Sequence, residues 1–204
     1  MFVGFFLVTL VLVYWFMKSP QFVVVDSWVK QNTLLYVVVL FVYKTIGILW
    51  PPIPAGLLTL LSIPFLGWFG AYLVDLIGSI TGGSIAYFLG QKYGLTLLKK
   101  IFDENMIEKI KKAKIKKGKE IEAVFMYRVF LGTTILEAIY YGAGLLKVGF
   151  GKFLIGATLS HIAVGVPMFI LAQNIFGGKN IVITIALIAV GVIFVYKTKG
   201  RYFE

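Results

Sequence analysis

The stretch Glu120–Phe153 constrains this chain most, because it is apolar enough to enter a membrane and yet carries two charges, Arg128 and Glu137. A charge at membrane depth costs at least ~2.5–3.5 kcal/mol on insertion scales, so an arginine there indicates a functional site. The residues between the two charges weaken a helix; they include Gly132, Thr133 and Thr134. We therefore predict two half-helices that meet at a break near Gly132, forming a re-entrant hairpin over 120–149.

The composition indicates an integral membrane protein. The 204 residues are 59% hydrophobic and 14% charged, whereas soluble domains are about 25% charged. Although the net charge is +11, ten of the twenty basic residues lie within residues 91–120. Membrane orientation and anionic lipid explain such a cluster better than nucleic acid does. The absence of cysteine excludes disulfides and thiolate metal sites.

Four apolar stretches are predicted to cross the membrane. They cover residues 2–17, 67–90, 153–176 and 181–196. Residues 1–32 would form an N-terminal transmembrane helix with an interfacial connection, residues 33–176 the core, and residues 177–204 a last helix with a basic tail.

A second break lies in the segment 33–66. Its first apolar part ends in prolines, through which no helix continues; these are Pro51, Pro52 and Pro54. The apolar piece 57–66 is too short to cross a bilayer alone, so the segment is predicted to be another re-entrant hairpin. The alternative is a full span, a loop and an interfacial segment. Lys44 lies in the first arm, where it either snorkels to the interface or faces inward.

Small residues line the predicted span 67–90. Gly78, Gly82 and Ala86 recur at four-residue spacing, which lets another helix approach closely. Asp75 is predicted to be buried in this span. It either forms a structural salt bridge, for example with Lys44, or belongs to a transport path.

Charge distribution sets the predicted topology. Residues 91–120 hold ten lysines and four acids, with apolar residues at helical spacing, which predicts amphipathic helices on the cytoplasmic surface. If 120–148 crossed the membrane, this segment and the basic tail would lie on opposite faces, against the positive-inside rule. We therefore predict an all-α polytopic protein with about four spans, two oppositely oriented re-entrant hairpins and both termini in the cytoplasm.

Broken helices at membrane depth form binding sites in transporters. Arg128 would lie about 12 Å along its helix from Glu120, near the midplane. A guanidinium there grips phosphate oxygens through a fork of donors. We predict that Arg128 binds a lipid phosphate, with Tyr127, Thr133 and Thr134 as neighbouring hydrogen-bond donors. The alternative is an internal ion pair with Glu137 or Asp75.

Two motifs resemble the DedA family, also called the VTT or SNARE-associated Golgi family. Residues 78–94 resemble its G-x-x-x-G-D-x-x-x-Y-x-x-G-R-x-x-G signature. Residues 125–153 resemble its F-x-x-R…A-G…F block, through Phe125, Arg128, Ala143, Gly144 and Phe153. The break at 51–54 falls where the family has its P-x-x-P-G-E hairpin tip. The resemblance covers about residues 33–175.

The resemblance implies the same four-span, two-hairpin architecture and lipid translocation, either of polyprenyl phosphate carriers or of phospholipids. Three family positions differ here. The family glutamate corresponds to Gly56, its aspartate to Gly83, and its second arginine to Thr134. Asp75 and Glu137 would then take over proton coupling, or the protein would be an uncoupled scramblase.

The function expected from the sequence is movement of an anionic phospholipid or polyprenyl phosphate across the cell membrane. The alternatives are a proton- or cation-coupled transporter of another small substrate and a non-transporting scaffold. An enzyme is not expected, because the chain has one histidine, His161, and two arginines. We expect no cofactor, no metal and no nucleic acid. Membrane lipids with phosphate headgroups are the expected partners, and homo-oligomer formation is left open.

Overall fold

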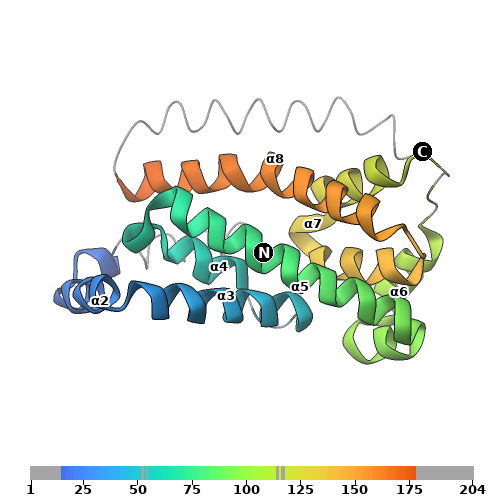
Figure 1. Ribbon diagram of the computed structural model, residues 1–204, viewed down its shortest axis with the longest axis horizontal. Coiled ribbons are helices and arrows are strands. Elements are labelled where there is room, and N and C mark those ends of the chain that lie inside the picture. Colours follow the sequence, from blue (N-terminus) through green and yellow to red (C-terminus); the bar gives the residue numbers. More distant parts are fainter. Residues whose placement is uncertain (1–14, 52, 54, 114, 116–117, 178–204) are drawn as a thin grey trace.

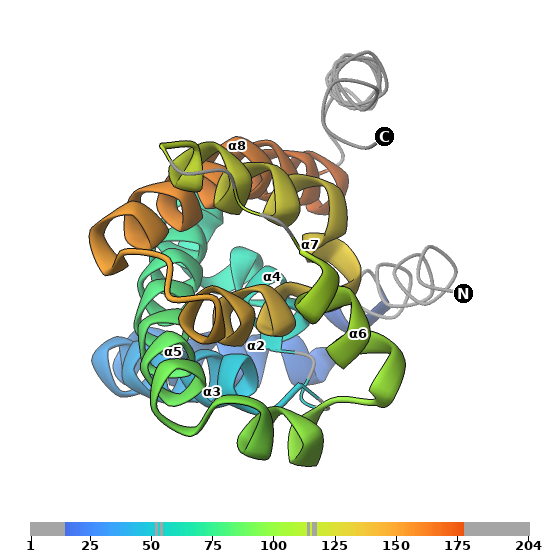
Figure 2. The ribbon, with the colours of Figure 1, turned by 90° about the vertical axis from the view of Figure 1, so that its right-hand side faces the viewer.

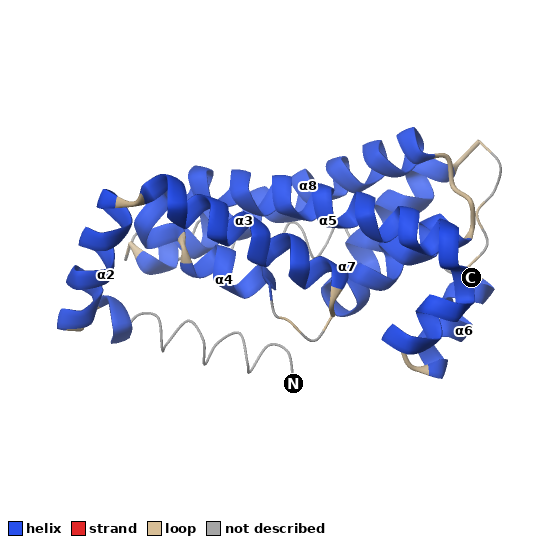
Figure 3. Ribbon diagram, turned by 60° about the horizontal axis from the view of Figure 1, so that its bottom comes forward, coloured by secondary structure: helices blue, strands red, loops and turns tan. Residues whose placement is uncertain are grey.

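Every regular element that the structure describes is an α-helix (Figures 1 and 3). This computed structural model describes residues 15–177 except 52, 54, 114, 116 and 117, and it describes no side chains for 55 and 130–136. The predicted spans 2–17 and 181–196 therefore lie almost wholly outside the described residues. The all-helical fold class predicted from the sequence is confirmed for the described part.

Two helices at the start of the described chain meet at a sharp bend. Helix α2 (Pro20–Gln31) has proline in its first turn, where the missing N–H costs nothing. Helix α3 (Thr33–Leu49) follows at an angle of 99°. The segment 18–32, predicted as a connection, is thus largely helical, and Lys30 and Asp26 pair across one turn of it at 2.6 Å.

The chain folds back after α3 into α4 (Ala55–Leu61), across the proline-rich segment. The two helices contact each other in antiparallel order. Near one end the Tyr36 hydroxyl lies 2.7 Å from Ser62 Oγ, and near the other a Cβ on Gly56 would lie 3.6 Å from Lys44 Nζ. The segment 33–66 therefore folds back on itself, with α3 and α4 in contact.

The long helix α5 (Ile63–Ile101) lies between α3 and α8 (Phe150–Phe176), as Figures 1 and 2 show. It contains two non-helical points, Gly67 (φ 69°) and Gly94 (φ 54°). Both angles lie in the left-handed region that favours glycine. Gly67 is the first residue of the predicted span, so its backbone turn separates the hairpin from the helix that follows.

The small residues of α5 allow close packing against α3. A Cβ on Gly78 would lie 2.6 Å from Lys44 Cγ, and a Cβ on Gly82 would lie 2.8 Å from the Thr45 carbonyl oxygen. Ala86, one turn further along, is fully buried. This close approach is what the four-residue spacing of small residues predicts.

A short amphipathic helix, α6 (Glu104–Lys112), lies at the opposite end of the molecule from α2 (Figure 1). Asp103 caps its N-terminus by accepting a hydrogen bond from the Met106 N–H at 2.8 Å. Ile107 and Ile110 are buried, whereas the lysines are exposed. The helix predicted within the lysine-rich segment is therefore confirmed.

Helix α7 (Glu120–Leu145) folds back on itself. Its start runs parallel to α8, because Glu120 pairs with Lys152 at 3.1 Å and Arg128 reaches Ala157 and Ser160. Its start and its end also line one cavity, to which Val124 and Gly142 both contribute. A straight helix would separate those two residues by about 27 Å. Gly132 itself is helical. The chain therefore reverses its direction within α7, although no break at Gly132 divides α7 into two helices.

Two of the described helices, α5 and α8, are long and apolar enough to cross a membrane. The bent pair of α2 and α3 passes the same test when taken together, which gives up to three candidate spans in the described part. These helices support the prediction of an integral membrane protein.

A close contact between α5 and α7 supplies a stability prediction. A Cβ on Gly90 would lie 2.2 Å from the Tyr141 carbonyl oxygen, so Gly90→Ala should destabilise the fold by about 1–3 kcal/mol through overpacking. Thermal unfolding in detergent measures the effect. Gly151→Ala is the control, because nothing lies within 4 Å of its added Cβ. Equal melting temperatures for the two variants would contradict the α5–α7 packing.

Candidate functional site

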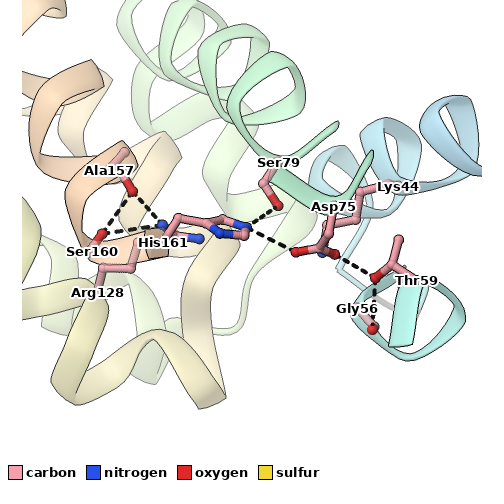
Figure 4. Close-up of polar contacts among 9 residues, drawn as sticks. All are labelled: Lys44, Gly56, Thr59, Asp75, Ser79, Arg128, Ala157, Ser160 and His161. Atoms are coloured by element: carbon pink, nitrogen blue, oxygen red, sulfur yellow. Dashed lines mark hydrogen bonds and ion pairs between the residues drawn. The ribbon is translucent and has the colours of Figure 1, made fainter. Parts of the chain in front are cut away.

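The centre of the site is Asp75, a carboxylate buried on α5 (Figure 4). Lys44 Nζ lies 2.6 Å from its Oδ1 atom, and Thr59 Oγ1 donates to the same oxygen at 2.5 Å. His161 Nε2 lies 3.0 Å from Oδ2. Both carboxylate oxygens are therefore satisfied, which a buried charge requires.

His161 links α8 to this carboxylate. Its Nε2 atom also lies 3.2 Å from Ser79 Oγ, and its ring lies 5.7 Å from that of Tyr72 between centroids. Its Nδ1 atom and the Tyr72 hydroxyl are buried without a hydrogen-bond partner in the described part. The histidine thus has one nitrogen engaged and one available for a proton or a ligand.

Arg128 lies on the first part of α7 and is 8% exposed. Its Nη1 atom donates to the Ala157 carbonyl oxygen at 2.5 Å and to Ser160 Oγ at 3.2 Å (Figure 4). The guanidinium also lies 5.5 Å from the centre of the Tyr140 ring. No carboxylate among the described side chains lies within 4 Å of it, so the ion pair considered as the alternative is not formed with Asp75 or Glu137.

The structure separates Tyr127 from Arg128. Consecutive residues on a helix do not face the same way. Tyr127 lines a cavity next to α6, whereas Arg128 points to α8. Pairing Tyr127 with Arg128 in one phosphate site therefore does not fit this geometry. Thr133 and Thr134 lie in the stretch whose side chains are not described.

The remaining predicted residues are placed as follows. Glu137 is half-buried on the second part of α7 and joins no ion pair in the described part of the chain. Lys44 and Arg128 are close enough to act electrostatically on its carboxyl group. Pro51 lies in the turn after α3, while Pro52 and Pro54 lie outside the described residues. Glu137 is thus close to the site without being fixed to a partner.

Four polar residues of the site were not among the predicted ones: Thr59, Ser79, Ser160 and His161. The signal for His161 was available, because a titratable residue inside an apolar helix indicates function by default. Hydroxyl residues are common in membrane helices and give no comparable signal. Among the described residues, no three His, Cys, Asp or Glu side chains cluster in a way that could hold a metal ion.

Comparison with known families shows which family the chain belongs to. The family model of the VTT domain matches residues 53–174, which is 122 of 204 residues. The chain belongs to the VTT domain family. No match was found among curated proteins or among solved structures. The DedA resemblance inferred from the two motifs is thereby confirmed.

Two family positions can now be placed inside this VTT domain. At position 56, where the family has glutamate, a side chain would begin 3.6 Å from Lys44 Nζ. In this chain that lysine pairs with Asp75. At position 83, where the family has aspartate, a Cβ would lie 3.0 Å from the Tyr140 ring. The tyrosine packs where the family aspartate would start.

Removing the central carboxylate tests the site energetically. Asp75→Asn should cost about 3–5 kcal/mol of stability, because it leaves the Lys44 ammonium buried without a counter-charge. The double variant Lys44→Met/Asp75→Asn should recover much of that loss. Thermal unfolding in detergent measures both.

Asp26→Asn is the matched control, because Asp26 belongs to an ion pair whose lysine is 73% exposed. Exposed pairs contribute about 0–1 kcal/mol. If the double variant is no more stable than Asp75→Asn, an unpaired Lys44 charge is not the cause of the lost stability.

Proposed function

We propose that this VTT domain protein moves an anionic lipid, a phospholipid or a polyprenyl phosphate, across the bilayer as a transporter or scramblase. The observation that carries the proposal is Arg128, a buried arginine without a carboxylate partner in the described part. A buried cation without a counter-charge is costly. A lipid phosphate passing the site would supply the missing negative charge.

The geometry of Arg128 suits this role. Its contacts with Ala157 and Ser160 both use Nη1, so they fix the side chain. Its other two nitrogens make no hydrogen bond to a described residue and are left for a ligand. Phosphate oxygens accept paired N–H donors from arginine more favourably than from lysine. Lys44 is less suited to bind a lipid, because Asp75 already neutralises it.

In this proposal, the two helical hairpins line the path that the lipid takes across the bilayer. The first, α3 with α4, brings Lys44 and Thr59 to the centre, and the second, α7, brings Arg128. We propose that both are re-entrant and enter from opposite faces of the membrane. With the spans outside the described residues this gives four crossings and cytoplasmic termini, as the positive-inside rule requires.

Side-specific labelling tests this topology. Single cysteines at Asn105 and Lys147 should react with an impermeant maleimide from the cytoplasmic side, because the second hairpin returns to the face it entered. A cysteine at Gly177, after α8, should react from the other side. Since the chain has no cysteine of its own, each label reports one position. Labelling of Asn105 and Lys147 from opposite faces would exclude a re-entrant α7.

Substitution of the arginine tests the function. In vesicles reconstituted with fluorescent phosphatidylglycerol, Arg128→Lys should reduce lipid movement by about tenfold or more, since the point charge loses the bidentate geometry. Its melting temperature should change little. Ser160→Ala is the comparison, because it removes one anchor of the guanidinium and keeps the charge. Full activity of Arg128→Ala would defeat the proposal.

The same assay separates scrambling from coupled transport. The contact of His161 with Asp75 is the observation that favours proton coupling, because histidine changes charge near neutral pH. A coupled transporter moves lipid faster when a pH gradient is imposed, whereas a scramblase responds to lipid concentration alone. Comparing vesicles with and without the gradient decides between the two modes.

A further inference from the structure

An apolar feature of the structure lies away from the charged residues of the candidate site, between α6 and the two ends of α7. It is a cavity of about 60 Å³ whose walls include Ile110 from α6, Val124 and Tyr127 from the start of α7, and Gly142 from its end. Neither Arg128 nor Asp75 lines it. Figure 2 shows α6 and α7 next to each other at this end of the molecule.

Small residues of α7 face α6 in the wall of this cavity. A Cβ on Gly142 would lie 3.2 Å from Ile110 Cγ2, and Ala138 in the preceding turn is buried in the same wall. A water molecule needs about 10–15 Å³ and at least two polar partners. The cavity has room for several waters but offers almost only apolar side chains, so hydrocarbon fits it better than water.

Among the described residues, one charged side chain lines this cavity. Lys109 is exposed on α6 and takes part in no ion pair within the described part of the chain. Lys112, on the same helix, is already paired with Glu108 at 3.1 Å. An apolar space with an available ammonium beside it is complementary to an amphiphile that carries a negative headgroup.

The amphipathic pattern of α6 places this cavity at a membrane surface. Its buried isoleucines and exposed lysines are typical of a helix lying in the interface, where anionic lipids gather near basic residues. We propose that the cavity binds the hydrocarbon chain of an anionic membrane lipid whose phosphate contacts Lys109. This lipid stays bound between α6 and α7, and it is separate from the lipid that Arg128 moves.

Photo-crosslinking tests the proposal on the full chain. The protein is placed in nanodiscs that contain phosphatidylglycerol with a diazirine in its acyl chain, and the labelled peptides are mapped by mass spectrometry. Labels should fall in residues 106–115 and 121–127. A phosphatidylcholine analogue with the same chain should label these peptides about fivefold less, as expected for one lysine near the surface.

Two variants test the two halves of the site. Ala113→Phe adds a ring to a half-buried residue of the cavity wall, and it should reduce labelling of these peptides by about tenfold while labelling elsewhere is unchanged. Lys109→Gln should abolish the preference for phosphatidylglycerol. Lys111→Gln is the matched control, because Lys111 is exposed on the same helix but does not line the cavity.

The outcomes are distinguishable from those of the transport assay. Arg128→Ala should keep the labelling of this cavity even though it loses lipid movement. Unchanged labelling in Ala113→Phe, equal labelling by the two lipids in the wild type, or equal effects of Lys109→Gln and Lys111→Gln would each overturn the proposal.

Discussion

The fold depends on how an apolar helical bundle accommodates buried charge. Asp75 and Lys44 form an ion pair in which each partner's side chain is at most 8% exposed, and removing such charges from water costs several kcal/mol each before any attraction is counted. Thr59 and His161 complete the hydrogen bonding of the carboxylate. Four helices, α3, α4, α5 and α8, are therefore held in register by one side chain, which explains why so much of the molecule converges there.

The small residues of α5 serve this same constraint. Gly78 lies against the stem of Lys44, so the lysine can reach Asp75 only because its neighbour on α5 has no side chain. The equivalent closeness of Gly90 to the Tyr141 carbonyl brings the end of α7 onto α5. The buried ion pair and the close approach of the helix backbones thus both depend on the small residues of α5.

Sequence reasoning identified the parts of this arrangement that carry a high cost. Charges in apolar segments are rare, so Lys44, Asp75 and Arg128 could be recognised without a structure, as could the proline-rich break after α3. It could not identify the hydroxyl partners Thr59, Ser79 and Ser160, because such residues are inexpensive in apolar helices. It also paired Tyr127 with Arg128 by proximity in sequence, although their helical positions direct them to different neighbours. The helix at 20–31 was missed despite Pro20 at its start and the i, i+4 pair Asp26–Lys30, both of which favour a helix.

The order of residues on α8 has a mechanical consequence. Ser160 holds Arg128, and His161, the next residue, holds Asp75. Neighbouring positions on one helix share a rigid backbone and differ by about 100° in direction. A rotation or slide of α8 that released the guanidinium would therefore displace the imidazole in the same movement. Arg128 and Asp75, which do not touch each other, are therefore mechanically coupled through α8.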